Sequence, residues 1–199
     1  IHVRMKADTD DLGSNRGSEA PVIRNLWYRY DTLPTEWPQD LHVWYGVALR
    51  LTNNKAPILW TALYADLADT ETWEPLIPEA FPPPSIVISS GHGFHLYWLL
   101  QTPLTDAVEV RRWLRLIARR VGGDPNAAEP ARVLRVPGTR NIKYADPPLC
   151  AMVECHPERR YAPEQFGSEE ELEPDQEPVQ LDEIVPEPVN WNEVTFPEG

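Results

Sequence analysis

Acidic and histidine residues recur at three places in the chain, and their types suit metal-dependent chemistry on phosphates. Asp66 lies near the end of the mostly apolar run "ILWTALYADL" (58–67), which is followed by Ala68 and Asp69. A second segment, "SGHGFH" (90–95), ends in His95. The third segment, "GGDPNAAEPARVLRVPGTRN" (122–141), combines acids with arginines. Burying a carboxylate without a partner is costly, so an aspartate in an apolar strand needs a metal, a cation or hydrogen bonds.

Each segment also has a purely structural interpretation. The glycines of the second segment let the backbone turn tightly and approach a ligand, and its serine and amides can bind anionic oxygens. A core histidine bonded to a carbonyl is the alternative. In the third segment Asp124 and Glu129 lie near Arg132, Arg135, Arg140 and Lys143. Cations close to acids favour a polyphosphate beside a metal, and a surface salt-bridge network is the alternative.

The elements that must position these residues follow from hydrophobic pattern and turn signals. We expect strands at 1–5, 41–51, 58–67 and 149–155, and two strands around a turn in 86–100. A helix should begin after an N-cap at Thr105 and stop at Gly122 and Gly123.

Two faces of this expected helix differ in character. Its buried stripe is Ala107, Val110, Leu114, Ile117 and Val121. Another face carries Arg111, Arg115 and Arg119, which either contact a DNA backbone or form a solvated basic surface.

Composition predicts one globular domain with a tail. A chain of 199 residues with 42% hydrophobic content can close one substantial core. The net charge of −13 is concentrated in 164–199, which hold 12 of the 31 acids and no Lys or Arg. We therefore expect a nearly neutral catalytic domain at 1–163 and an acidic, proline-rich linker or tail at 164–199.

Cysteine usage and hydropathy indicate the setting. Cys150 and Cys155 define neither a disulfide framework nor a closed zinc pattern, although His156 is adjacent. With no 18-residue apolar run, we expect a soluble, cytoplasmic protein with no membrane partner. Because the chain begins at Ile1, we expect it to be a piece of a longer protein.

The three segments together resemble the catalytic domain of the archaeo-eukaryotic primase superfamily, in particular the primase-polymerases of plasmids and phages. The resemblance covers about 41–145, and "RVLRVPGTRNIK" is its most specific motif. It implies an α/β (α+β) fold with an RRM-like antiparallel or mixed sheet packed against helices. It also implies a Mg²⁺ or Mn²⁺ site and transfer of an NTP or dNTP on a single-stranded DNA template or primer, often beside a helicase module or protein.

Site residues follow from the resemblance position by position. Asp66 matches the first metal-binding acid, Asp124 the third, and Glu129 is the fallback for the third. His95 matches the histidine that binds the nucleotide's phosphates. Further positions near the triphosphate are Ser90, Arg135, Asn141 and Lys143.

The chain departs from the family at residue 68, where Ala68 replaces the second carboxylate. Two metal ions about 4 Å apart need bridging carboxylates to offset their repulsion. Three explanations stay open: a substitution introduced to disable the chain, natural loss of catalysis, or a one-residue shift that lets Asp69 serve. The last requires the strand to end or bulge there.

Three functional hypotheses follow. The first is a DNA primase or primase-polymerase domain, and the second is a non-catalytic module that binds nucleotide or single-stranded DNA. The third is a metallo-nuclease or zinc protein using His92, His95, Cys155 and His156, whose ligands are scattered in the sequence.

Overall fold

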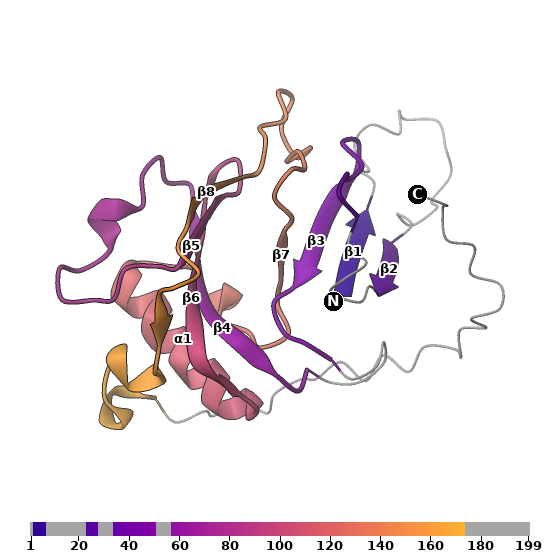
Figure 1. Ribbon diagram of the computed structural model, residues 1–199. Coiled ribbons are helices and arrows are strands. Elements are labelled where there is room, and N and C mark those ends of the chain that lie inside the picture. Colours follow the sequence, from indigo (N-terminus) through magenta and orange to yellow (C-terminus); the bar gives the residue numbers. More distant parts are fainter. Residues whose placement is uncertain (1, 7–22, 28–33, 51–56, 174–199) are drawn as a thin grey trace.

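The computed structural model describes residues 2–6, 23–27, 34–50 and 57–173, and these form strands around one long helix (Figure 1). The strands are β1 (His2–Lys6), β2 (Ile23–Trp27), β3 (His42–Gly46), β4 (Trp60–Ala68), β5 (Ile86–Ser89), β6 (Gly93–Leu104), β7 (Val133–Arg135), β8 (Ala151–Cys155) and β9 (Arg160–Tyr161). The helix is α1 (Ala107–Val121), and short 3-10 turns are η2 (Glu74–Leu76), η3 (Pro125–Ala127), η4 (Pro163–Gln165) and η5 (Glu169–Glu171). The expected α+β class is confirmed.

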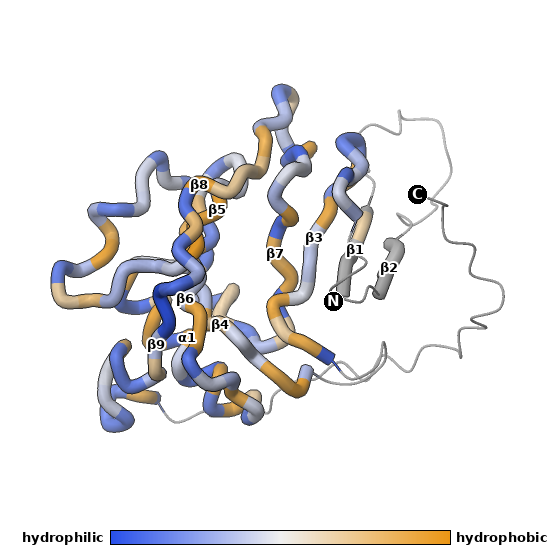
Figure 2. The backbone as a smooth tube through the Cα atoms, in the orientation of Figure 1, coloured by the Kyte–Doolittle hydropathy of each residue, from blue (hydrophilic) through white to orange (hydrophobic). Residues whose placement is uncertain are grey.

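The described strands form two sheets. The first has the order β2-β1-β3-β7, and the second has the order β4-β6-β5-β8 with β9 added in parallel to β6. All other pairings within them are antiparallel. Helix α1 lies on the second sheet. Strand β7 is the strand of the first sheet that lies on the side of the second sheet (Figure 1). Figure 2 shows hydrophobic residues along β5 and β7 and hydrophilic residues at the loop tips.

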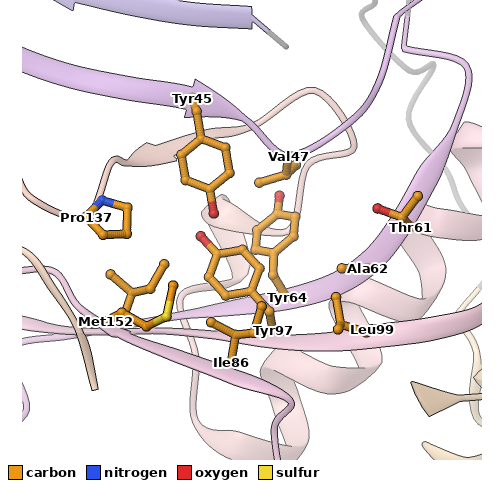
Figure 3. A pocket seen from close by; sticks show the side chains of 11 residues that line it. Tyr45, Val47, Thr61, Ala62, Tyr64, Ile86, Tyr97, Leu99, Pro137 and Met152 are labelled. Carbon is orange, nitrogen blue, oxygen red and sulfur yellow. The ribbon is translucent and has the colours of Figure 1, made fainter. Parts of the chain in front are cut away.

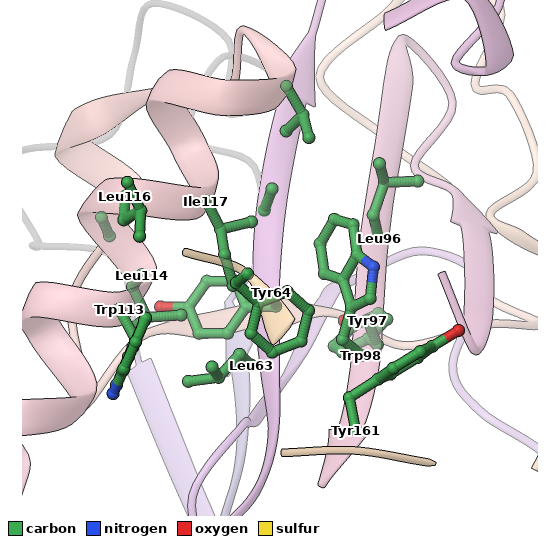
Figure 4. Packing of buried hydrophobic residues seen from close by; sticks show 14 of the residues in the cluster. Leu63, Tyr64, Leu96, Tyr97, Trp98, Trp113, Leu114, Leu116, Ile117 and Tyr161 are labelled. Atoms are coloured by element: carbon green, nitrogen blue, oxygen red, sulfur yellow. The ribbon is translucent and has the colours of Figure 1, made fainter. Parts of the chain in front are cut away.

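Helix α1 forms where the pattern predicts, with its start one residue later. Asp106, not Thr105, is the N-cap, because its carboxylate accepts the amide of Val108 at 2.8 Å. Gly122 ends the helix in the left-handed region at φ 67°. The expected stripe is buried except for the half-buried Ala107. Figure 4 shows Leu114 and Ile117 of this stripe, together with Trp113, on the side of α1 that faces the aromatic residues of β4 and β6.

Strand predictions fail mainly where strands are short. The segments 58–67 and 86–100 are confirmed as β4 and as β5 with β6, whereas 41–51 shrinks to β3. Strands β2, β7 and β9 have five, three and two residues and were missed. Such short strands exist through their partners, so no local pattern identifies them.

The segment 123–135 ties the two sheets together. It leaves α1 along the free edge of β4, where the Tyr64 hydroxyl donates to the carbonyls of Ala127 at 2.8 Å and Glu129 at 2.6 Å. The Trp60 indole donates to the carbonyl of Pro130 at 2.8 Å. The segment then enters β7, which pairs with β3 of the first sheet. Residues on it therefore reach the space between the sheets.

Packed structure continues beyond the boundary expected at residue 163. Phe166 and Leu172 belong to the main core, and Phe166 lies 5.8 Å from the ring of Phe81. The rest of the expected tail, 174–199, lies outside the described residues. The division into a catalytic domain and a tail stays a prediction.

Substitution of Gly93 should test how tightly β4 and β6 close. A Cβ at Gly93 would lie 1.9 Å from the carbonyl oxygen of Leu67, so the two backbones would have to separate. We expect Gly93→Ala to lower the free energy of unfolding by about 2 to 4 kcal/mol in urea titrations.

Gly138→Ala is the matched control, because Gly138 also has a positive φ, 87°, but nothing lies within 4 Å of its added Cβ. We expect this control to cost only about 1 to 2 kcal/mol, from backbone strain alone. Equal losses in the two variants would contradict the close approach at Gly93.

Candidate active site

The pairing of β4 with β6 places Asp66 directly opposite His95. The Asp66 Oδ1 and His95 Nε2 atoms are 3.8 Å apart, and their side chains are 21% and 5% exposed. Partner residues in an antiparallel ladder project to the same face, so both side chains enter the space beside the first sheet. Two residues 29 positions apart in the sequence thus form one acid and imidazole pair.

Asp124 reaches the same place along the open edge of β4. Its amide donates to the carbonyl of Asp66 at 2.8 Å, and the preceding Gly123 lies so close that a Cβ would be 3.3 Å from that carbonyl. The Asp124 carboxylate caps η3 by accepting the amide of Asn126 at 2.8 Å. The structure therefore brings together the predicted first and third acids.

Opposing charges act on Asp66. Burial raises the pKa of its carboxyl above the usual value, the positive charge of Arg132 opposes this rise, and the carboxylate of Asp124 adds to it. Arg135 also lowers the pKa, by a smaller amount. The site is thus a half-buried pair of acids held beside two guanidinium groups.

His95 stays neutral in this setting. Burial lowers its pKa from 6.5 to about 3, and the charges of Arg135 and Arg132 push it in the same direction. Within the described part of the chain, its Nδ1 atom is buried and has no hydrogen-bond partner. A neutral imidazole carries one N–H and one lone pair, so it can donate to an oxygen of a ligand.

Two of the predicted phosphate-binding residues, Ser90 and Asn141, are in direct contact. The carbonyl of Ser90 accepts from Asn141 Nδ2 at 3.2 Å and from Cys150 Sγ at 3.3 Å. Asn141 is buried, so it fixes the turn that carries Ser90 and His92. Lys143 is exposed, with Nζ 5.8 Å from the centre of the Tyr144 ring.

Arg135 lies over β3. Its guanidinium is 3.2 Å from His42 Nδ1 and 5.5 Å from the centre of the Trp44 ring. Sequence reasoning included Arg135 but missed His42, and it noticed Arg132 without placing it at the acids. The recurrence of arginine in the Arg-Val-Leu-Arg stretch was the available signal, because Arg132 directly precedes β7 and Arg135 ends it.

Ala68 and Asp69 mark the end of β4. Ala68 is exposed and pairs with Gly93. Asp69 has φ 51°, its amide donates to the carbonyl of His92 at 2.7 Å, and its side chain is 85% exposed. Across the described ranges, no group of three His, Cys, Asp or Glu side chains is placed to hold a metal. The hypothesis that Asp69 replaces the missing ligand therefore stays a prediction.

The fallback acid and the helix arginines are engaged elsewhere. Glu129 forms an ion pair of 3.0 Å with Arg111, whose side chain is 3% exposed. Arg119 pairs with Glu173 and donates to the carbonyl of Glu171. Arg115 also has an interaction partner. Contact of these arginines with DNA stays a prediction.

The zinc hypothesis gains no support from the geometry. His156 lies between Glu154 at 3.6 Å and Glu158 at 3.3 Å, near the end of β8. His92 and His95 instead face Asp69 and Asp66. The four residues of that hypothesis do not form one site.

An apolar cavity of about 260 Å³ lies between residues of the two sheets (Figure 3). Tyr64 and Tyr97, which are paired two positions from Asp66 and His95, line it from the second sheet, and Tyr45 lines it from the first. Burial raises the pKa of all three tyrosines, so they remain neutral. This part of the space between the sheets is therefore apolar and uncharged.

Comparison with known proteins defines the class. Residues 57–168 match the model of the RepB DNA-primase N-terminal domain, which covers more than half of the chain, and the chain belongs to this family. A search of curated proteins found no match.

Two solved structures share the fold. The AEP domain of the primase-polymerase (PrimPol) of cyanophage S-2L is 17% identical, with a TM-score of 0.60 over 82% of this chain and 86% of that chain. The primase RepB' is 14% identical, with a TM-score of 0.54 over 82% of this chain and 54% of that one. The resemblance to the plasmid and phage type of archaeo-eukaryotic primase is confirmed.

A search of the described residues found no helix long and apolar enough to cross a membrane.

The stability of the fold should fall in acid because of His95. The folded pKa of about 3 lies below the ordinary 6.5, so the unfolded chain takes up a proton that the folded chain refuses. His95 contributes fully above pH 6.5 and progressively less below it, by about 2 kcal/mol at pH 5. Urea titrations at pH 7.5 and pH 5 should show this loss in the parent and not in His95→Gln.

His156→Gln serves as the control, because His156 is partly exposed beside two carboxylates, and this variant should keep the loss. An NMR titration in which the His95 imidazole protonates near pH 6.5 would contradict the burial effect.

Proposed function

We propose that this domain catalyses template-directed nucleotidyl transfer from an NTP or dNTP on single-stranded DNA, as a DNA primase or primase-polymerase. The observation that carries the proposal is the placement of Asp66 opposite His95, with Asp124 on the edge of the same strand. Membership of the RepB primase family and the primase-polymerase fold support it.

The donor set suits a hard divalent cation. Asp66 and Asp124 offer carboxylate oxygens, the ligands that Mg²⁺ and Mn²⁺ take, and their mutual repulsion would be relieved by a positive ion. When bound, the ion would neutralise charge on the reacting phosphate. Asp66 and Asp124 would hold it, although Ala68 leaves one ligand position without a carboxylate.

The other side chains would bind and orient the nucleotide. Arg132 and Arg135 offer guanidinium donors to phosphate oxygens, and neutral His95 offers one N–H without adding charge. Ser90, whose carbonyl accepts from Asn141, and the exposed Lys143 would add further donors to the phosphates. The 3′-hydroxyl oxygen would bond to the α-phosphorus while the bond to the leaving pyrophosphate breaks, and water would take the hydroxyl proton. Such transfer depends on positioning and on charge stabilisation.

We also propose where DNA binds and which partner the domain has. We assign the template and primer to the surface near Asp66 and Ser90, and the arginines of α1 are a second surface whose ion pairs would first have to open. A helicase module or protein is the partner that the family suggests.

Ala68 favours a second candidate function. A domain that lacks a bridging carboxylate could bind nucleotide or single-stranded DNA without joining nucleotides. In that case nucleotide binding would persist while extension of a primer is absent.

Removal of the Asp66 charge should abolish the reaction. We expect Asp66→Asn to lower Mn²⁺-dependent extension of a labelled DNA primer by at least about 1,000-fold, as expected when a metal ligand is lost. Glu79→Gln, which removes an exposed carboxylate from the loop before β5, should leave extension unchanged. Full extension by Asp66→Asn would rule out the proposed site.

The Ala68→Asp substitution should separate the two candidate functions. We expect it to increase primer extension with dNTPs or NTPs, because a carboxylate at this exposed end of β4 would supply the missing ligand. The comparison is primer extension by the parent and the variant in Mn²⁺. If both proteins bind nucleotide and neither extends the primer, the binding-module function replaces the polymerase function.

A further inference from the structure

A second aspartate and histidine pair lies at the end of the β4 and β6 ladder. Asp66 pairs with His95 and Ala68 with Gly93, so the same register, continued past the strand, brings Asp69 opposite His92. The amide of Asp69 donates to the carbonyl of His92 at 2.7 Å, which extends the ladder by one bond. The chain thus repeats, three positions further on, the residue types of its candidate active site.

The spacing of this second pair suits a shared ion better than a direct bond. Asp69 Oδ1 and His92 Nδ1 are 4.0 Å apart, too far for a hydrogen bond between them. Two ligands that are each about 2.1 Å from one metal ion lie roughly 3 to 4.2 Å from each other, depending on the angle. The gap between Oδ1 and Nδ1 is therefore wide enough for a cation.

Both side chains are held in place while staying accessible. The His92 ring stacks on Tyr144 at 3.9 Å between centroids, with 18° between the planes. The left-handed backbone at Asp69 turns its side chain away from the strict alternation of β4. The side chains of Asp69 and His92 are 85% and 53% exposed, so an ion can enter from solvent.

Phosphate and water would supply the remaining ligands of the ion. Ser90 belongs to the same turn as His92, and Lys143 is next to Tyr144, so the pair lies among the residues we assign to phosphates. Protein sites for catalytic divalent ions often use one or two side chains and take their remaining ligands from phosphate and water. A pair of protein ligands is then sufficient.

We infer that Asp69 and His92 form a cation-binding pair at the end of the β4 and β6 ladder, which binds Mn²⁺ in preference to Mg²⁺ and would serve the proposed reaction. The role of this pair in the reaction rests on the proposed function, whereas Mn²⁺ binding to the pair can be measured without it. Imidazole nitrogen suits transition ions, whereas Mg²⁺ takes oxygen ligands, so the mixed pair selects the softer ion.

The test measures Mn²⁺ binding to the chain with no nucleotide present. Titration calorimetry gives the affinity, and electron spin-echo spectroscopy detects a nitrogen bound to Mn²⁺. We expect a nitrogen signal in the parent that is lost in His92→Gln. We expect Mn²⁺ affinity to fall by about tenfold or more in both His92→Gln and Asp69→Asn. An equal concentration of Mg²⁺ should not displace the Mn²⁺.

Matched controls keep the result specific. Asn tolerates the left-handed backbone of Asp69, so Asp69→Asn removes charge without changing the turn. His156→Gln removes another partly exposed histidine beside carboxylates and should leave the nitrogen signal intact. A signal that survives in His92→Gln, or is lost in His156→Gln, would overturn the inference.

Primer extension by the same proteins separates the two proposals. If Asp66→Asn is inactive and His92→Gln keeps the nitrogen signal, the inference fails and the proposed function stands. If Asp66→Asn still extends the primer while His92→Gln loses the signal, the proposed function fails and the cation pair stands.

Discussion

The placement of a carboxylate on a largely buried edge strand is the constraint on which the rest of the site depends. Asp66 lies between two sheets, where removal of water disfavours its charge. The segment 123–135 brings charged groups to Asp66, because it follows the open edge of β4 and then joins the first sheet as β7. That one crossing supplies Asp124, Arg132 and Arg135. A loop that only connected α1 to β7 would leave Asp66 without these charges.

The sequence predicts the parts of the site that depend on local pattern. Helix α1 follows from its stripe and its glycine stop, and β4 to β6 follow from apolar runs around a turn. The positions of Asp66, His95 and Asp124 were found through motifs of one family, and the register of β4 and β6 then places the first two side by side. Strand alternation decides which face each side chain takes, and the family motifs and the register of the two strands supply the rest.

Long-range packing decides what the sequence could not show. Arg111 lies on the polar side of the helical pattern, yet it is buried, because Glu129 from the segment 123–135 closes over it. Asn141, which is expected near a triphosphate, donates to the carbonyl of Ser90, 51 positions away. The left-handed backbone of Asp69 depends on a bond to the β5 and β6 turn. Each of these contacts joins segments that no window of the sequence contains together.

Charge placement also indicates the side from which a nucleic acid would approach. On α1, Arg112, Arg119 and Arg120 contact the acidic stretch around η5, through the carbonyls of Leu172 and Glu173 or the carboxylates of Glu171 and Glu173. A phosphate chain on that face would have to displace these acids, at little net gain in exposed ion pairs. Arg132 and Arg135 act instead on Asp66. Their positive charges would favour an anion near Asp66 although the whole chain carries a charge of −13, because screening limits the influence of distant acids to about 10 Å.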